Sequence, residues 1–346
     1  MNFFVNLAMG MGNSGVEHAQ FYRAKRFDQV NLPYRFVFME LINNLHDAMD
    51  HWDIHDEQVI NLWEYLVLGD EYALNGLQHR HERDHHLVVD YTKTHRMQEF
   101  VTESGLRIRE YFIKKPNPEK EGFLLVSTDR VEIFDAETGV RKVSYRIQEQ
   151  PKHEPKIVNI HVYELNGHHH LYFENLVQLN RYFFKQLDRL FPGENTFIID
   201  RGEDNEVALL DDPDSKRKLV DVVHADHLSD RDVPSAPLWN NYYEYVLTHL
   251  DRVDRLVVAT KLQRKDLLID FPDAADKIVT IPVGGVSDDV QKFTPKKLTE
   301  PLKLITVSRL AEEKHIDLIV RAVAQLRAAG HPVTLDIFGQ DRKSVV

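Results

Sequence analysis

The sequence of 346 residues contains no cysteine, which excludes a disulfide framework, a thiolate nucleophile and any metal site built on cysteine. No apolar run approaches the roughly 20 residues that a membrane-spanning helix needs. Lys and Arg number 43 against 55 Asp and Glu, and the net charge of −12 argues against nonspecific binding to nucleic acid. The first residues lack a basic leader followed by a long apolar core. We therefore expect a cytoplasmic protein, and peripheral association with a membrane through a partner stays open.

The order of predicted elements indicates an α/β protein with Rossmann-like domains. A strand at residues 3–7, a helix at about 16–28 and a strand at 34–40 form a βαβ unit. The same rhythm returns later in the chain. The later predicted strands cover residues 197–200, 219–225, 255–259 and 278–281, with helices at 177–190 and 237–250.

Between these two α/β parts the apolar residues alternate with period two, which is typical of an antiparallel sheet. The predicted strands cover residues 106–113, 122–127, 131–135, 140–147, 156–164 and 170–173. Asn166-Gly167 between two of these runs is a strong hairpin signal. The block is therefore predicted as an antiparallel β insert.

These patterns predict a Rossmann-like N-terminal domain over residues 1–75 and 195–300, interrupted by a β-rich insert over 76–194. Residues 301–346 are predicted to begin a second Rossmann-like domain. Residues 287–300 are polar and contain proline, as linkers do. The two strands and one helix after them, ending with a strand at 333–338, bury too little area to close a sheet. We therefore expect the natural protein to continue beyond Val346.

A glycine-rich loop follows the first predicted strand. Gly10, Gly12 and Gly15 match the dinucleotide fingerprint G-x-G-x-x-G, and Glu40 ends the next strand, where that fingerprint places an acidic residue. An NAD-dependent oxidoreductase is one alternative, and a tight strand-to-helix turn without a ligand is another. The same geometry suits any phosphate or sugar hydroxyl. The candidate substrate loop consists of Gly12, Asn13, Ser14 and Gly15.

The run from His81 to His85 matches the metalloprotease pattern H-E-x-x-H. A zinc-binding helix needs an apolar face that holds two imidazoles against a core, but residues 78–86 are polar all round. We therefore expect a solvated turn or helix there and no metal site. His168, His169 and His170 are expected on the surface, at a hairpin turn.

A predicted strand at 219–225 leaves His224 and His227 at its carboxyl end, where open α/β sheets bind ligands. Asp226 between them is placed to orient an imidazole. Either one histidine contacts a substrate, or both are loop histidines with internal partners. The sequence does not decide which of the two faces a cleft.

Arg309 and Lys314 follow a predicted strand at 304–307, and a helix is predicted over residues 312–326. Two cations at the carboxyl end of a strand, beside a helix N-terminus, suit a diphosphate. The alternative is a pair of solvated cations on a surface helix.

Residues 308–314, S-R-L-A-E-E-K, resemble the donor-diphosphate motif of retaining, nucleotide-sugar-dependent glycosyltransferases of family 4, which have the two-domain GT-B architecture. Residues 6–24 and 238–245 resemble the A subunits of the accessory Sec-system O-glycosyltransferases. In that family the glycine loop faces the cleft between the domains. Gly284 and Gly285 match the family's strand end at the interdomain hinge, where the donor passes.

The resemblance implies an enzyme that moves a hexose, above all N-acetylglucosamine, from a UDP-sugar to Ser or Thr of a serine-rich surface adhesin. Arg309 and Lys314 would stabilise the negative charge that builds on the departing UDP. His224 or His227 would touch the sugar, and the glycine loop would position sugar or acceptor. Because side chains supply the positive charge, we expect no metal and no cofactor besides the donor substrate.

A β-rich insert also resembles that of teichoic acid α-glycosyltransferases, which act on poly(glycerol-phosphate) or poly(ribitol-phosphate). In the Sec-system family the insert implies docking to a B-like subunit, whereas in the second group it implies oligomerisation and polymer binding. The basic residues of the insert lie among acids, which favours a polypeptide acceptor. Family 4 enzymes carry a later E-x7-E pair that binds the donor. This sequence ends before such a pair, so we expect the fragment itself to be inactive.

Overall fold

The computed structural model describes residues 1–12, 14–117, 120–150, 153–212, 216–233, 236–284, 299 and 301–339. The chain divides into two compact units, Met1–Gly285 and Val286–Val346. Asn13, Gly285 and the expected linker at residues 287–300, apart from Thr299, lie outside the described residues. The domain bounds expected from the sequence stay a prediction.

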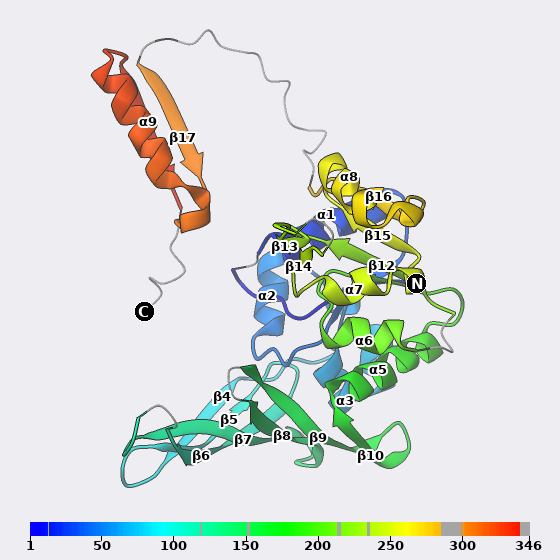
Figure 1. The fold of residues 1–346 in the computed structure, drawn as a ribbon. Coiled ribbons are helices and arrows are strands. Elements are labelled where there is room, and N and C mark those ends of the chain that lie inside the picture. The colour runs from blue at the N-terminus through cyan, green and yellow to red at the C-terminus, as the bar shows by residue number, and fades with distance from the viewer. Residues whose placement is uncertain are drawn as a thin grey trace. The chain divides into compact units, whose positions relative to one another are not determined.

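The described part of the first unit contains a sheet of seven parallel strands with helices on both faces (Figure 1). The strand order is β16-β15-β12-β11-β1-β2-β3, and every neighbouring pair is parallel. The strands span Asn2–Asn6 (β1), Tyr34–Phe38 (β2), Val59–Asn61 (β3), Thr196–Ile199 (β11), Lys218–Val223 (β12), Arg255–Val258 (β15) and Ile278–Thr280 (β16). This confirms the predicted Rossmann-like arrangement.

Two apolar layers cover this sheet, because successive side chains of a strand point to opposite faces. Phe4 packs on one face with α1 (Gly15–Gln29) and α2 (Leu45–Trp52). Phe3 and Val5 pack on the other face. The remaining helices are Leu62–Leu68 (α3), Asp70–Asn75 (α4), Leu176–Leu190 (α5), Asp204–Leu210 (α6), Glu244–Thr248 (α7) and Lys261–Asp270 (α8). Among the helices described, none has the length and apolar character that crossing a membrane requires.

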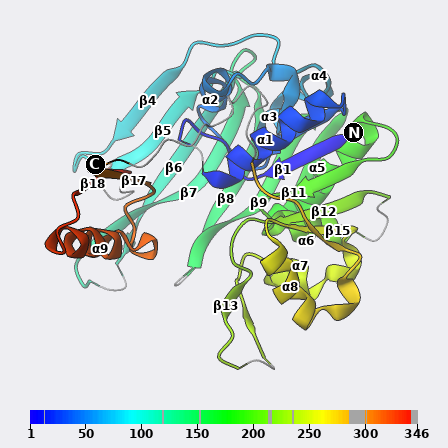
Figure 2. The ribbon, with the colours of Figure 1, turned by 90° about the horizontal axis from the view of Figure 1, so that it is seen from above.

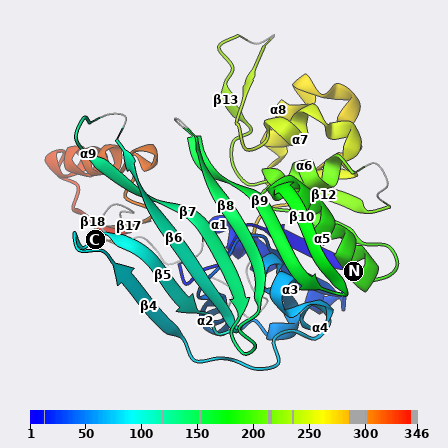
Figure 3. The same ribbon diagram turned by 90° about the horizontal axis from the view of Figure 1, so that it is seen from below.

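The insert forms a second sheet of the first unit, with seven antiparallel strands side by side in the described residues (Figure 3). Its inner face packs on α3 and α5, so that Ile133 and Val143 share one core with Trp63 and Phe183. The strands span Asp84–Val89 (β4), His95–Val101 (β5), Leu106–Pro116 (β6), Leu124–Asp135 (β7), Arg141–Gln150 (β8), His153–Leu165 (β9) and His168–Asn175 (β10). The predicted hairpin at Asn166-Gly167 is confirmed between β9 and β10.

Three predictions about the insert were wrong. The strands predicted over 122–127 and 131–135 are the single strand β7, which begins at Leu124, because the register shifts around Asp129 and a bulge breaks the alternation. The solvated turn or helix expected over 78–86 runs into strand β4, whose residues are exposed throughout and so show no period-two signal. His168, His169 and His170 are exposed as expected, but they lie in β10, because Leu165 already pairs with His168.

The helix predicted over 237–250 was also wrong. Leu238–Trp239 (β14) pairs with Leu228–Asp230 (β13), and the helix α7 begins only at Glu244. The β13–β14 hairpin projects beside α7 and α8 (Figure 2). Trp239 of β14 stacks on Phe271. This aromatic side chain therefore packs as part of the hairpin and not along a helix face.

The second unit is a βαβ unit made of Leu302–Val307 (β17), Ile316–Ala328 (α9) and Val333–Phe338 (β18). The two strands are parallel. A short 3-10 helix, Glu312–Lys314, lies between β17 and α9. Val323 and Val333 are the buried hydrophobic residues among those described in this unit.

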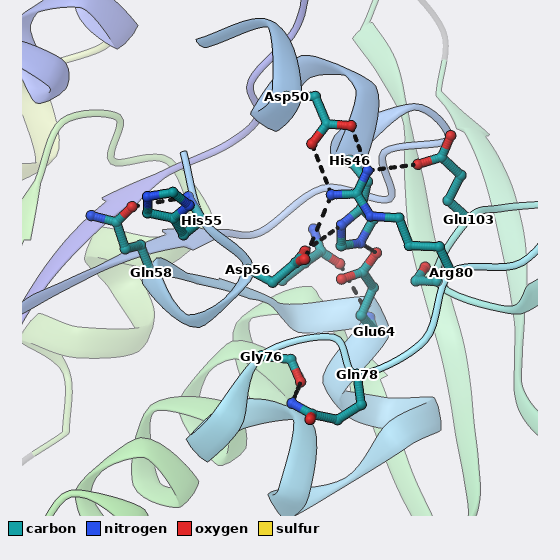
Figure 4. A network of polar contacts seen from close by, with 12 residues as sticks. His46, Asp50, His55, Asp56, Gln58, Glu64, Gly76, Gln78, Arg80 and Glu103 are labelled. Carbon is teal, nitrogen blue, oxygen red and sulfur yellow. Dashed lines mark hydrogen bonds and ion pairs between the residues drawn. The ribbon is translucent and has the colours of Figure 1, made fainter. Parts of the chain in front are cut away.

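A buried histidine lies where the parallel-sheet part of the first unit meets the insert (Figure 4). His46 Nδ1 is 2.9 Å from Asp56 Oδ1, and Nε2 is 3.0 Å from Glu64 Oε1. Burial alone lowers the pKa of His46, but the hydrogen bonds and charges of Asp56 and Glu64 outweigh it and raise the pKa to about 9. His46 is therefore an imidazolium at neutral pH.

Arg80 extends this network into the insert (Figure 4). It lies just before β4, and its Nη2 donates to Asp50 at 2.9 Å and lies 3.5 Å from Asp56. Its Nη1 lies 3.4 Å from Glu103, which follows β5. One arginine thus joins the acids around α2 to the first hairpin of the insert.

Candidate functional site

The candidate site lies where the strand order of the parallel sheet reverses. From β1 the chain continues to β2 on one side, whereas β11 continues to β12 on the other, and β1 and β11 are neighbours. Ligands of open α/β sheets bind at the carboxyl ends of the strands at such a switch point. Asn6 ends β1, Asp200 follows β11 and His224 follows β12.

The Asp200 carboxylate connects these strand ends to α1. Arg23 binds it through both terminal nitrogens, at 2.7 and 2.8 Å, and Gln20 donates to it at 2.7 Å. His224 Nε2 lies 2.8 Å from Asp200 Oδ1. Asn6 in turn donates to Gln20 at 3.3 Å. Each polar side chain in this buried network therefore has a partner, as the low dielectric of the interior demands.

The structure separates the two candidate histidines. His224 is bound to Asp200, and its backbone N–H donates to the Tyr243 hydroxyl at 3.0 Å. His227 is 2% exposed, its two ring nitrogens have no hydrogen-bond partner in the described chain, and its ring stacks on Trp239. Burial lowers the pKa of His227, which favours the neutral ring. Of the two, His224 therefore lies among the polar groups of the switch point.

The N-terminus of α1 is closed by its own residues. Ser14 Oγ accepts from the backbone N–H of Val16, and Glu17 accepts from the backbone N–H of Ser14 at 2.7 Å, which is a capping box. Burial alone raises the pKa of Glu17, but the hydrogen bonds from Ser14 outweigh it and lower the pKa. An ionised carboxylate therefore lies where a dinucleotide-binding helix would receive a phosphate.

The glycines of the candidate loop leave open space around them. A Cβ added at Gly12 or Gly15 would meet no atom within 4 Å. In the dinucleotide fingerprint the third glycine permits close packing of helix and strand, and Gly15 meets no such constraint here. Trp52 anchors the loop by donating to the Gly10 carbonyl at 2.9 Å. The loop is thus fixed at its start, and Gly12 and Gly15 are exposed.

Gly284, the described half of the predicted hinge pair, follows β16. Its φ of +76° is the left-handed region that favours glycine, and a Cβ there would lie 3.3 Å from the ring of Tyr22 on α1. Any other residue would be strained at this position.

Charged residues from three segments gather around the same sheet edge. Arg201 donates to Ser14 Oγ at 3.4 Å. Burial raises the pKa of Glu40, which follows β2, and the charge of Glu154 adds to this effect. Burial also raises the pKa of Glu203, with Glu154 again contributing. Because Glu154 belongs to β9, the insert reaches the carboxyl edge of the parallel sheet.

Arg309 and Lys314 belong to the second unit. Arg309 follows β17 and Lys314 ends the 3-10 helix that precedes α9, so both come after the carboxyl end of a parallel strand, as predicted. Both are exposed within their unit. His315, with φ of +48°, turns the chain from the 3-10 helix into α9. The described residues contain no group of three or more side chains suited to hold a metal ion.

Sequence reasoning missed Asp200, Arg23 and Gln20. Asp200 could have been predicted as a site residue, because it ends a predicted strand and the carboxyl ends of parallel strands meet at one edge of the sheet. Arg23 and Gln20 carried none, since a polar residue on an amphipathic helix is usually solvated.

No protein-family model matches the chain. It is 31% identical over 369 residues to the Streptococcus gordonii UDP-N-acetylglucosamine–peptide N-acetylglucosaminyltransferase GtfA subunit, and the match covers 97% of this chain and 70% of that protein. The solved pneumococcal O-GlcNAc transferase GtfA in complex with UDP and GlcNAc aligns over 99% of this chain and 71% of that chain, with a TM-score of 0.60 and 26% identity. A solved GtfA/B complex aligns over 98% of this chain and 71% of that chain, with a TM-score of 0.62 and 27% identity. The chain therefore belongs to the family of GtfA subunits of peptide N-acetylglucosaminyltransferases, which are glycosyltransferases of GT-B architecture.

Proposed function

We propose that the protein to which this chain belongs transfers N-acetylglucosamine from UDP-N-acetylglucosamine to Ser or Thr hydroxyls of a serine-rich acceptor polypeptide. The chain spans about 70% of the length of its curated relatives, and the transfer is proposed for a version of their full length. The name of the S. gordonii relative states such a peptide transfer, and the pneumococcal relative was solved with UDP and GlcNAc. A retaining, family 4 reaction in the cytoplasm, without a metal, belongs to the same proposal. Its support is the S-R-L-A-E-E-K motif, whose cations supply charge that other enzymes take from a metal ion.

The observation that carries the proposal is the closed N-terminus of α1. The carboxylate of Glu17 occupies the start of the helix and repels an anion there. A loop of this kind suits neutral hydroxyl groups of a sugar or a Ser side chain better than a pyrophosphate. The negative donor group then needs cations elsewhere in the chain.

Arg309 and Lys314 are the proposed cations for the donor diphosphate. As the bond between the sugar and the β-phosphate breaks, negative charge develops on the leaving oxygen. Fixed positive groups stabilise that charge more in the transition state than in the bound donor. The acceptor hydroxyl forms the new bond to the anomeric carbon, and UDP leaves.

The remaining site residues are proposed to hold the sugar and the acceptor. His224 contacts the sugar, whereas His227 supports the β13–β14 hairpin through Trp239. Gly12, Asn13, Ser14 and Gly15 are the proposed substrate loop, and Gly284 and Gly285 are the proposed hinge. The domain division at residues 76, 195 and 301 is part of this proposal.

The insert is proposed to dock a B subunit. Support comes from the GtfA/B complex to which the chain aligns, and from the outer face of the sheet. There, arginines lie over aromatic rings, as Arg130 does over Tyr111 at 4.2 Å and Arg109 over Phe134 at 4.7 Å. Rigid arginine and aromatic groups are enriched at protein interfaces.

The test measures ligand binding and transfer separately. Calorimetric titration of the purified chain with UDP and with NADH distinguishes a glycosyltransferase from a dinucleotide enzyme. A version extended past Phe338 to the length of the relatives is then given radiolabelled UDP-N-acetylglucosamine with a serine-rich peptide or with poly(glycerol-phosphate), in the presence and absence of a B subunit. We expect UDP binding and label in the peptide. NADH binding without UDP binding would overturn the proposal, and label in the polymer alone would move the acceptor to teichoic acid.

A further inference from the structure

The carboxylate of Asp200 is fully buried, and both of its oxygens accept hydrogen bonds. Arg23 and Gln20, which bind it, lie on α1, the helix that begins at the glycine loop. His224, its third partner, follows β12. The carboxylate therefore connects the helix of the substrate loop to the histidine proposed to contact the sugar.

The charge of Asp200 determines how it can hold the imidazole. Burial alone raises its pKa, but the charges and hydrogen bonds of Arg23 and His224 outweigh it and lower the pKa to about 2. An ionised carboxylate only accepts hydrogen bonds, so the hydrogen between Asp200 and His224 lies on Nε2. Within the described chain no hydrogen bond engages His224 Nδ1, which leaves that nitrogen for a ligand.

The pKa of a second buried acid, Asp221, is shifted in the opposite direction to that of Asp200. Asp221 on β12 is 2% exposed, and burial together with the charges of Glu206 and Asp200 raises its pKa well above the usual value. Asp221 is therefore neutral while Asp200 is ionised. The two buried carboxyl groups, one directly after β11 and one on the adjacent strand β12, provide a matched pair for substitution by the amide.

We propose that Asp200 is a positioning residue of the transfer reaction: it holds Nε2 of His224 in a fixed hydrogen bond and thereby presents Nδ1 to the sugar. The proposal rests on the proposed function, because only a sugar-contacting His224 needs such orientation. In other enzymes the partner of one ring nitrogen sets the orientation and tautomer of the histidine in the same way.

A double-mutant cycle, made in a version of the protein extended to the length of its relatives, tests whether Asp200 acts through His224. Asp200→Asn should lower kcat by roughly tenfold to a hundredfold, which is the usual cost of removing a group that orients a functional histidine. In a His224→Ala background the same substitution should cost less than about twofold further, because the group it orients is gone. If Asp200→Asn lowered kcat by the same factor in the wild type and in the His224→Ala background, Asp200 would not act through His224, and the proposal would be overturned.

Asp221→Asn is the control, because an amide replaces a neutral carboxyl group of the same shape. It should leave kcat within about twofold of the wild type, while Asp200→Asn does not. Equal losses in the two variants would show that any change at a buried acid disturbs the sheet, which would contradict a specific role for Asp200.

A second measurement needs no change at Asp200 and no turnover. Nitrogen-15 spectra of histidine-labelled wild-type chain, with His224→Gln to assign the signal, should show a hydrogen on Nε2. A hydrogen on Nδ1 and none on Nε2 would overturn the proposal. If a wild-type version extended to the length of the relatives transfers no sugar, the proposed function fails, and the spectrum still reports whether Asp200 holds the ring.

Discussion

The carboxylate of Glu17 accepts a hydrogen bond of 2.7 Å from the backbone N–H of Ser14, and an acid thus closes the start of α1. The Ser14 hydroxyl completes the box by accepting from Val16 at 3.3 Å. The first turn of the helix therefore depends on the side chain of Ser14 in the candidate substrate loop and on that of Glu17 in α1.

Ser14→Ala should lower the free energy of unfolding by about 1 kcal/mol, the typical cost of losing an N-cap. Urea denaturation of the purified chain measures this change. Ser14→Thr keeps a hydroxyl and should lose at most about half as much. Equal losses in Ala and Thr variants would mean that the cap contributes little to stability.

In a version of the protein extended to the length of its relatives, Arg309→Ala should lower the rate of sugar transfer by roughly a hundredfold or more, because a charge that stabilises the leaving group is lost. Arg321→Ala is the matched control, since Arg321 is an exposed arginine of α9 that pairs with Asp317 at 3.3 Å. The control should stay within about twofold of the wild type. Unchanged turnover in Arg309→Ala would remove this residue from the donor site.

The stability of the chain should fall as the pH rises toward the pKa of His46. The pKa is raised from 6.5 to about 9 on folding, so this contribution is complete below about pH 6.5 and is lost as the pH rises through about 9. From about pH 6 to about pH 10, the free energy of unfolding of the wild type should fall by roughly 3 kcal/mol more than that of His46→Gln.

Chemical denaturation of both proteins across this pH range provides the comparison. Burial raises the pKa of Glu206 to about 8, which lowers stability in the same direction, but this effect is present in both proteins and cancels. Parallel pH curves for wild type and His46→Gln would contradict an imidazolium between Asp56 and Glu64.

Asn166→Ala should destabilise the insert by about 1–2 kcal/mol. Asn166 has a φ of +50°, and its amide donates to the Tyr65 hydroxyl at 2.8 Å and to Asp70 at 2.7 Å. Alanine tolerates the left-handed backbone poorly and makes neither bond. Thermal unfolding monitors the loss, with His168→Ala, an exposed change in the same hairpin, as a control expected to be nearly neutral.

The parts of the fold predicted best are those in which local signals agree with burial. The parallel strands are short apolar runs at the centre of the sheet, and Asn166-Gly167 specifies its own turn. The strand β4 has no inner face to bury, so its sequence carries no alternation. The helix expected over 237–250 failed because Trp239 pairs with Leu228 across a hairpin, which is a contact that no local pattern encodes.

The candidate site was predictable at the strand ends and in the motifs, and not on the helix faces. His224 and the glycine loop follow predicted strands, whereas Arg23 is one of several polar residues on α1. What distinguishes Arg23 is a carboxylate that lies 177 positions further along the chain. Pairings over such separations follow from strand order, which requires the topology of the whole sheet.

The network of His46, Asp56 and Arg80 has a consequence for how inserts of this kind can be exchanged. Arg80 of the insert pairs with Asp50 and Asp56 of the host, and the two parts also share an apolar layer, so their contacting surfaces must match. A graft from a homologue would leave Asp50 and Asp56 without their arginine unless it supplied a cation at the position of Arg80. Chimaeric proteins should therefore tolerate crossover points outside this junction far better than crossover points within it. A substitution on one side of the junction should be accompanied in homologues by a compensating substitution on the other side.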